Sequence, residues 1–136
     1  MIRFTLILSF LLFQFPQNQE TKHLGTWEGD DGVDIGYLIL DKEGYATLKA
    51  NGEVMGGKSA VIRGIEVYML FEINYQSAPV EIDFVIYKLA DDVEMGRLKG
   101  ILEFIDDNNM KLALGYTGSR PENFEGEDTI VFIKQP

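Results

Sequence analysis

The sequence contains no cysteine and only one histidine, His23, among its 136 residues. Without cysteine the chain forms neither disulfides nor thiolate metal sites, and it offers no thiol nucleophile. One histidine is too few for a zinc cluster and makes a Ser-His-Asp triad hard to assemble. We therefore expect no catalytic residues, no metal site and no cofactor, and we predict that the chain is not an enzyme.

Basic residues are also scarce. The chain has 12 Lys and Arg against 22 Asp and Glu, which gives a formal net charge of −10. Nucleic acids and anionic membranes are bound through clusters of Lys and Arg, which this composition lacks. We therefore expect no nucleic-acid partner. Hydrophobic residues make up 46% of the chain, enough to bury the core of one ordinary domain.

The first residues have the composition of a signal peptide. Arg3 is followed from Phe4 to Phe13 by a run of apolar residues interrupted only by Thr5 and Ser9. A basic start before a short apolar stretch is typical of such a leader. The stretch is too short for a membrane-spanning helix, which needs about 20 apolar residues. We predict a signal peptide over 1–18 and a secreted or periplasmic domain over 19–136, not inserted in a membrane once the signal is removed.

From Leu24 onward the apolar residues recur with a period of two, which is typical of β-strands with one buried face. The clearest stretch is 67–73, in which every second residue from Val67 is apolar. Turn residues separate such stretches. The predicted strands cover roughly 24–29, 33–41, 44–50, 57–63, 65–75, 79–90, 95–105, 109–117 and 128–134.

The connections between these strands are short and rich in Asp, Asn, Gly and Pro, so strands adjacent in sequence should be adjacent in the sheet. The sequence therefore predicts an all-β fold, an antiparallel up-and-down meander. Eight or nine twisted strands tend to curl and hide their edges, which favours a small barrel. A sandwich of two sheets is the alternative.

Two segments resemble a known family. Gly25-Thr26-Trp27 looks like the G-x-W signature of lipocalins and other calycins. The segment 80–134, with the loop Arg120-Pro121-Glu122-Asn123-Phe124-Glu125-Gly126, is similar to the C-terminal half of small secreted bacterial lipocalin-like domains of unknown function. The resemblance implies a lipocalin-like barrel that binds a small apolar or amphipathic molecule at its open end. It also implies that Trp27 plugs the closed end and that Arg120 packs over the indole.

Strand direction indicates where a ligand would enter. If nine strands alternate, the loops 29–34, 51–57, 74–79 and 105–109 lie at the end opposite Trp27. The expected ligand contacts are the inward apolar residues near that end: Ile35, Met55, Met69, Ile73, Tyr75, Ile82, Phe104 and Met110. Methionines and aromatic residues suit an adaptable apolar pocket, but the same side chains can also simply fill a small barrel.

Two further patterns invite a functional interpretation. Residues 52–59 match the phosphate-binding pattern G-x-x-x-x-G-K-[ST]. That site requires a helix after the lysine, whereas 59–64 is β-branched and ends in glycine, so we interpret 52–59 as a flexible loop. The acidic clusters at 30–34, 91–94 and 106–109 lack the spacing of a twelve-residue calcium loop, so we interpret them as turns.

A second class of function remains open. Strand parity places Tyr45, Tyr68 and Tyr87 on the outer face. They would suit a non-catalytic interaction module that binds a protein or polysaccharide of the cell envelope through its outer face. The sequence does not reveal the oligomeric state.

Overall fold

The computed structural model describes residues 21–29 and 36–136. The predicted signal peptide, the acidic residues 30–34 and Ile35 lie outside these ranges. Within them the alternating apolar pattern produces ten β-strands: β1 (Gly25–Gly29), β2 (Tyr37–Leu40), β3 (Ala46–Ala50), β4 (Glu53–Gly56), β5 (Ala60–Ile62), β6 (Ile65–Asn74), β7 (Val80–Lys88), β8 (Glu94–Phe104), β9 (Asn109–Leu114) and β10 (Thr129–Lys134).

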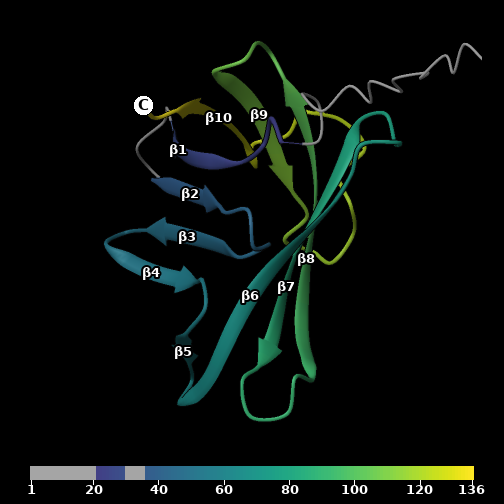
Figure 1. The fold of residues 1–136 in the computed structure, drawn as a ribbon. Helices are drawn as coiled ribbons and strands as arrows, with labels where there is room; N and C mark the ends of the chain where they lie inside the picture. Colours follow the sequence, from purple (N-terminus) through teal and green to yellow (C-terminus); the bar gives the residue numbers. More distant parts are fainter. Residues whose placement is uncertain (1–20, 30–35) are drawn as a thin grey trace, which may run out of the picture.

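The strands form one antiparallel sheet in the order β4-β3-β2-β1-β10-β9-β8-β7-β6-β5 (Figure 1). Every strand from β1 to β4 and from β5 to β10 pairs with its sequence neighbour, and β1 pairs with β10 to join the two series. The predicted all-β antiparallel meander is therefore confirmed. The strand count of eight or nine is wrong, because residues 21–29 and 36–136 form ten.

The additional strand is β4, which lies where we expected the loop 51–57. Asn51 and Gly52 both have positive φ, 52° and 78°, and make the tight turn that joins β3 to β4. One extra strand reverses the direction of every strand that follows it. The loops 75–79 and 105–108 therefore lie at the end where β1 begins, and the loop 115–128 lies at the opposite end. We name these the His23 end and the far end.

The sheet curls into a nearly closed barrel. At the His23 end the main chain of β6 meets the opposite edge of the sheet: Phe71 N donates to Gly44 O and Met69 N donates to Gly57 O, each at 3.0 Å. Tyr45 and Leu70 form an isolated bridge beside them. Toward the far end this ladder is interrupted, because β4 pairs with β3 while β5 pairs with β6.

Gly56 allows this close approach. A Cβ atom at this position would lie 2.5 Å from both Ala46 O and Met69 Cε, and its φ of +91° is unfavourable for other residues. A glycine at the end of β4 is therefore required for the edge of the sheet to fold against β6.

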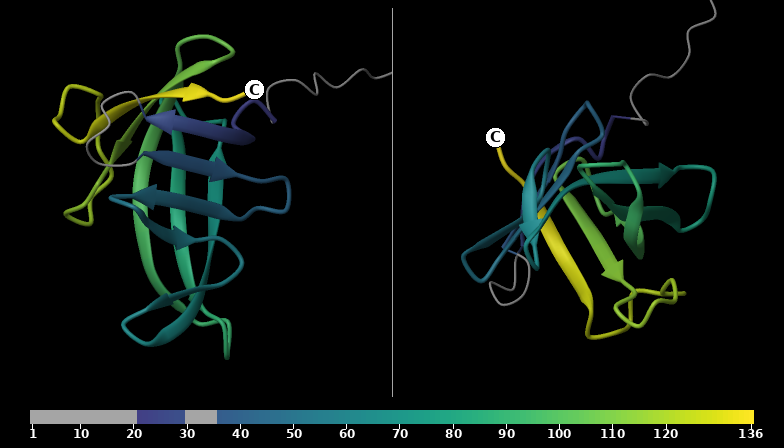
Figure 2. Two further views of the ribbon diagram at one scale, coloured as in Figure 1. Left: turned by 90° about the vertical axis from the view of Figure 1, so that its left-hand side faces the viewer. Right: turned by 90° about the horizontal axis from the view of Figure 1, so that it is seen from below.

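The curled sheet forms two walls. In the left-hand view of Figure 2, β1 to β4 lie in front and run across the long strands β6, β7 and β8 behind them. Side chains from both walls fill the space between them. This core consists of Trp27, Leu38, Leu40, Ala46, Leu48, Met69, Ile82, Phe84, Leu102, Met110, Leu112, Leu114, Ile130 and Phe132.

Candidate functional site

An apolar pocket of about 380 Å³ opens at the far end. Leu48 of β3 and Met55 of β4 form one wall, and Leu98 of β8 comes from the opposite wall of the barrel. Ala50 of β3 and Tyr116, which follows β9, complete the apolar lining, and Asn51 and Asp128 are the polar residues of the pocket. The pocket is therefore the mouth of the barrel interior on this side.

Side chains around this mouth are apolar and accessible. Met55 is 44% exposed and Tyr116 is 56% exposed, although both line the pocket. At the same end of the barrel, Leu89 and Val93 in the connection between β7 and β8 and Met95 at the start of β8 are also exposed. Flexible methionines at a mouth can adapt to ligands of different shape.

The predicted ligand contacts do not form a single site. Met55 lies at the far-end pocket, whereas Ile73 and Tyr75 line a different pocket at the His23 end. Phe104 stacks on Tyr75 with ring planes 7° apart and lines a third hollow of about 430 Å³. Met69, Ile82 and Met110 are buried in the core between the two ends, and Ile35 lies outside the described residues.

The sequence interpretation named only Met55 among the residues that line the far-end pocket and missed six others, namely Leu48, Ala50, Asn51, Leu98, Tyr116 and Asp128. Two of them carried a signal, since Leu48 and Leu98 occupy inward positions in alternating strands. The missing information was the direction of the strands, which depends on β4.

The His23 end is covered by residues 21–24, which cross the barrel just before β1. The indole Nε1 of Trp27 donates to His23 O at 2.9 Å, and the phenol of Tyr75 hydrogen-bonds to His23 Nδ1 at 2.5 Å. Lys22 adds an ion pair with Asp107 at 3.2 Å. These contacts hold the segment over the core at this end.

His23 is buried at this end, with 4% of its surface exposed. Burial, together with the positive charge of nearby Lys134, lowers the pKa of His23 from 6.5 to about 4. The imidazole is therefore neutral at pH 7 and takes part in hydrogen bonding without carrying charge.

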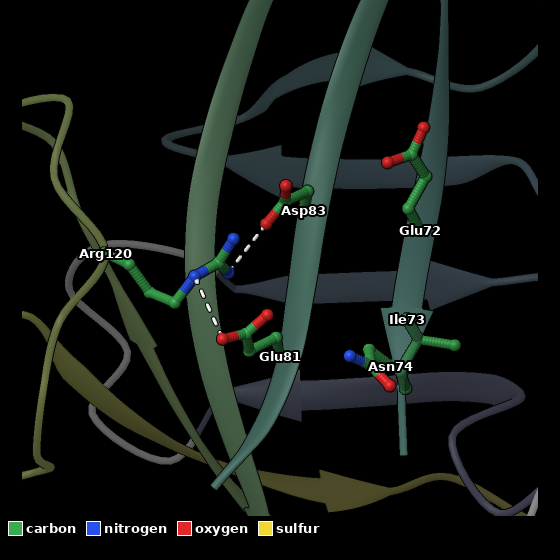
Figure 3. Close-up of a pocket in the computed structure, with 6 residues that line it drawn as sticks. All are labelled: Glu72, Ile73, Asn74, Glu81, Asp83 and Arg120. Carbon is green, nitrogen blue, oxygen red and sulfur yellow. Dashed lines mark hydrogen bonds and ion pairs between the residues drawn. The ribbon is translucent and has the colours of Figure 1, made fainter. Parts of the chain in front are cut away.

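Arg120 does not lie where the resemblance implied. Its Nη1 donates to Asp83 Oδ1 at 2.7 Å and to Gly100 O at 2.8 Å, and its Nε lies 3.6 Å from Glu81 (Figure 3). Asp83 and Glu81 project from the outer face of β7, whereas the indole of Trp27 is buried in the core. The ammonium of Lys134 lies over that indole instead, 5.4 Å from the ring centroid.

The contacts of Arg120 hold the long loop 115–128 against the outer face of β7 and β8. Asp83 also accepts a hydrogen bond from Arg97 Nη1 at 2.9 Å. Burial alone would raise the pKa of Asp83, but the hydrogen bonds from Arg120 and Arg97 outweigh it and lower the pKa. The hollow of about 280 Å³ beside these groups is therefore bordered by a carboxylate already neutralised by two arginines.

The three predicted outer tyrosines come together. Tyr68 and Tyr87 stack with centroids 5.2 Å apart, and Tyr45 meets Tyr68 edge-on at 6.4 Å. Tyr68 Oη donates to Asp92 at 2.8 Å, and the ammonium of Lys58 lies over the Tyr45 ring. We name these three residues the tyrosine row.

The segment 52–59 does not have the geometry of a phosphate-binding loop. It contains β4, and β5 rather than a helix follows it. Lys58 forms an ion pair with Glu43 at 2.9 Å. The interpretation of 52–59 as a flexible loop is corrected, since four of its residues are a paired strand.

Two acidic clusters contribute to turns. Asp106 accepts hydrogen bonds from Asn108 N and from the side chain of Asn109, and Asp91 accepts one from Val93 N. Across 21–29 and 36–136, no group of three or more His, Asp or Glu side chains is arranged to hold a metal ion. The same residues include no helix long and apolar enough to cross a membrane.

Comparison of the chain with protein-family models, with curated proteins and with solved structures finds no match.

Proposed function

We propose that the domain is a non-enzymatic, lipocalin-like binding protein that holds a small apolar or amphipathic molecule in the far-end pocket. The observation that carries this proposal is the apolar mouth between opposite walls of the barrel, where Leu48 and Met55 face Leu98. Asn51 and Asp128 supply polar groups for a hydrophilic part of the ligand.

The size of the pocket limits the ligand. Small-molecule pockets usually measure about 300 to 1,000 Å³, so about 380 Å³ suits a compact ligand or the end of a longer one. Because Met69, Ile82 and Met110 fill the interior below, the ligand binds at the mouth and does not pass through the barrel. We also propose that binding occurs outside the cytoplasm. The supporting observation is the leader-like composition of 1–18, and fractionation of cells with and without that segment tests it.

The neutral fluorescent amine N-phenyl-1-naphthylamine tests the pocket. We expect saturable fluorescence enhancement with the unmodified domain and binding at least about tenfold weaker with Met55→Asp, because a carboxylate must be desolvated beside the apolar probe. Met55 is 44% exposed, so the substitution leaves the core intact.

Ile105→Asp is the matched control. Ile105 is 52% exposed and lies at the His23 end, so its replacement should leave probe binding unchanged. Equal affinities for all three proteins, or equal losses in both variants, would contradict the assignment of the pocket. Urea unfolding of each variant shows whether a loss of probe binding results from a loss of stability.

The tyrosine row favours a second candidate function, a non-catalytic module that binds an envelope protein or polysaccharide through its outer face. Aromatic residues provide much of the energy of interaction surfaces. Under this hypothesis Tyr68→Ala with Tyr87→Ala abolishes capture of a macromolecular partner from an envelope extract, whereas Met55→Asp does not. Capture lost only with Met55→Asp would support the pocket instead.

A further inference from the structure

A second and larger pocket, of about 680 Å³, lies at the His23 end of the barrel. It is bordered by Thr21, His23 and Leu24, by the turn 41–44, and by Phe71 and residues 73–76 at and just after the end of β6. None of its lining residues belongs to the far-end pocket. The core side chains that fill the barrel separate the two pockets.

One side of this pocket is aromatic. The His23 ring meets Phe71 edge-on at 5.3 Å and lies 5.5 Å from the Tyr75 ring. Phe71 and Tyr75 are partly exposed and line the pocket. Aromatic faces carry partial negative charge and attract the weakly positive C–H groups of a ligand.

The rest of the lining offers planar hydrogen-bonding groups that the local fold holds in place. Asp41 Oδ1 accepts hydrogen bonds from Glu43 N at 3.0 Å and from Tyr45 N at 2.9 Å, which fixes the carboxylate and leaves Oδ2 as an acceptor. Asn74 Oδ1 accepts one from Gln76 N at 2.9 Å. The Nδ2 group of Asn74 and the side-chain amide of Gln76 remain available to a ligand.

The charges on the lining disfavour an anionic ligand. Asp41 and Glu43 are acidic, and Glu43 is already paired with Lys58. Lys42 is the single Lys or Arg among the described residues that line the pocket. Buried His23 is neutral at pH 7 and adds no positive charge. Hydroxyl groups both donate and accept, so they can satisfy carboxylate, amide and imidazole together.

We infer that the pocket at the His23 end binds a neutral saccharide, with sugar C–H groups against Phe71 and Tyr75 and hydroxyls bonded to Asp41, Asn74 and Gln76. This site is independent of the proposed far-end function. The ring face of a sugar packs against the aromatic side of the pocket, and its hydroxyls hydrogen-bond to the planar polar groups on the other side.

Titration of the isotope-labelled domain with maltose and with cellobiose, followed by amide chemical shifts, tests the inference. We expect saturable shifts confined to 21–24, 41–44 and 71–76, with a dissociation constant in the millimolar range or tighter. Gln76 is exposed and lines the pocket. Gln76→Ala should weaken binding at least about fivefold, because the sugar loses its hydrogen bonds to the glutamine amide. Asn108→Ala, an exposed amide at the same end that does not line the pocket, should leave binding unchanged.

Two further probes identify the chemistry. Glucuronate should bind more weakly than the neutral sugars, and choline should produce no comparable shifts. Preference for choline would identify a cation site and overturn the inference, as would the absence of shifts with both neutral disaccharides. N-phenyl-1-naphthylamine tests the far-end pocket and should not compete with the sugars, which test the pocket at the His23 end. A negative result with one probe is therefore distinguishable from a negative result with the other.

Discussion

Replacement of Trp27 by alanine is expected to lower the free energy of unfolding by about 3 to 5 kcal/mol, as large aromatic truncations in cores do. Trp27 has no exposed surface, and its indole N–H satisfies the carbonyl of His23. The truncation leaves a cavity and removes one of the contacts that hold residues 21–24 over the core. Urea unfolding of the two proteins measures the difference.

A double-mutant cycle identifies the partner of the indole. Trp27→Ala and Lys134→Ala should be less than additive by about 0.5 to 2 kcal/mol, because either substitution alone already removes the cation–aromatic contact. Trp27→Ala and Arg120→Ala should add, since Arg120 is bound to Asp83 on the outer face. Coupling to Arg120 with additivity to Lys134 would contradict this geometry.

Acidification is expected to destabilise the domain through His23 before the carboxylates contribute. The pKa of His23 is about 4 in the folded state and about 6.5 when unfolded. Between these values the unfolded chain binds a proton that the folded chain excludes, so stability falls as the pH drops from 6.5 toward 4. The total loss is roughly 3 kcal/mol.

His23→Gln provides the control, because glutamine hydrogen-bonds without titrating. Unfolding free energies measured at several pH values between 7.5 and 4.5 should decline for the unmodified domain and stay flatter for the variant. Identical slopes would show that His23 is not the responsible group. Asp83 acts in a different window, because its pKa is lowered and its stabilising charge is lost only below 3.8.

The sequence predicted the strand pattern well, because alternation of apolar residues directly reports which face of a strand is buried. It failed at β4, whose four residues are too few and too exposed to alternate clearly. The dipeptide Asn51-Gly52 was the available signal, since it favours the tight turn of a hairpin. Because this turn was overlooked, the loops that follow it were predicted at the wrong end of the barrel.

The binding residues were harder to predict, for a physical reason. Periodicity distinguishes inward from outward side chains but not their depth along the barrel. Met69 and Met55 are both methionines that we predicted as ligand contacts, yet one is buried and the other is at the mouth. Likewise, Lys134 reaches Trp27 because the two residues lie opposite each other where β1 pairs with β10. Local sequence does not specify that pairing.

The pairing of β1 with β10 also determines when folding can finish. Trp27 and Lys134 are register partners, and roughly 100 residues separate them along the chain. Bringing such distant segments together costs chain entropy before any contact energy is gained, which slows folding. During synthesis, β2, β3 and β4 can form hairpins as they emerge, but β1 lacks its second neighbour until β10 leaves the ribosome. Until then the edges of β1 and β9 stay open to other chains, so β10, made long after β1, protects both of these edges.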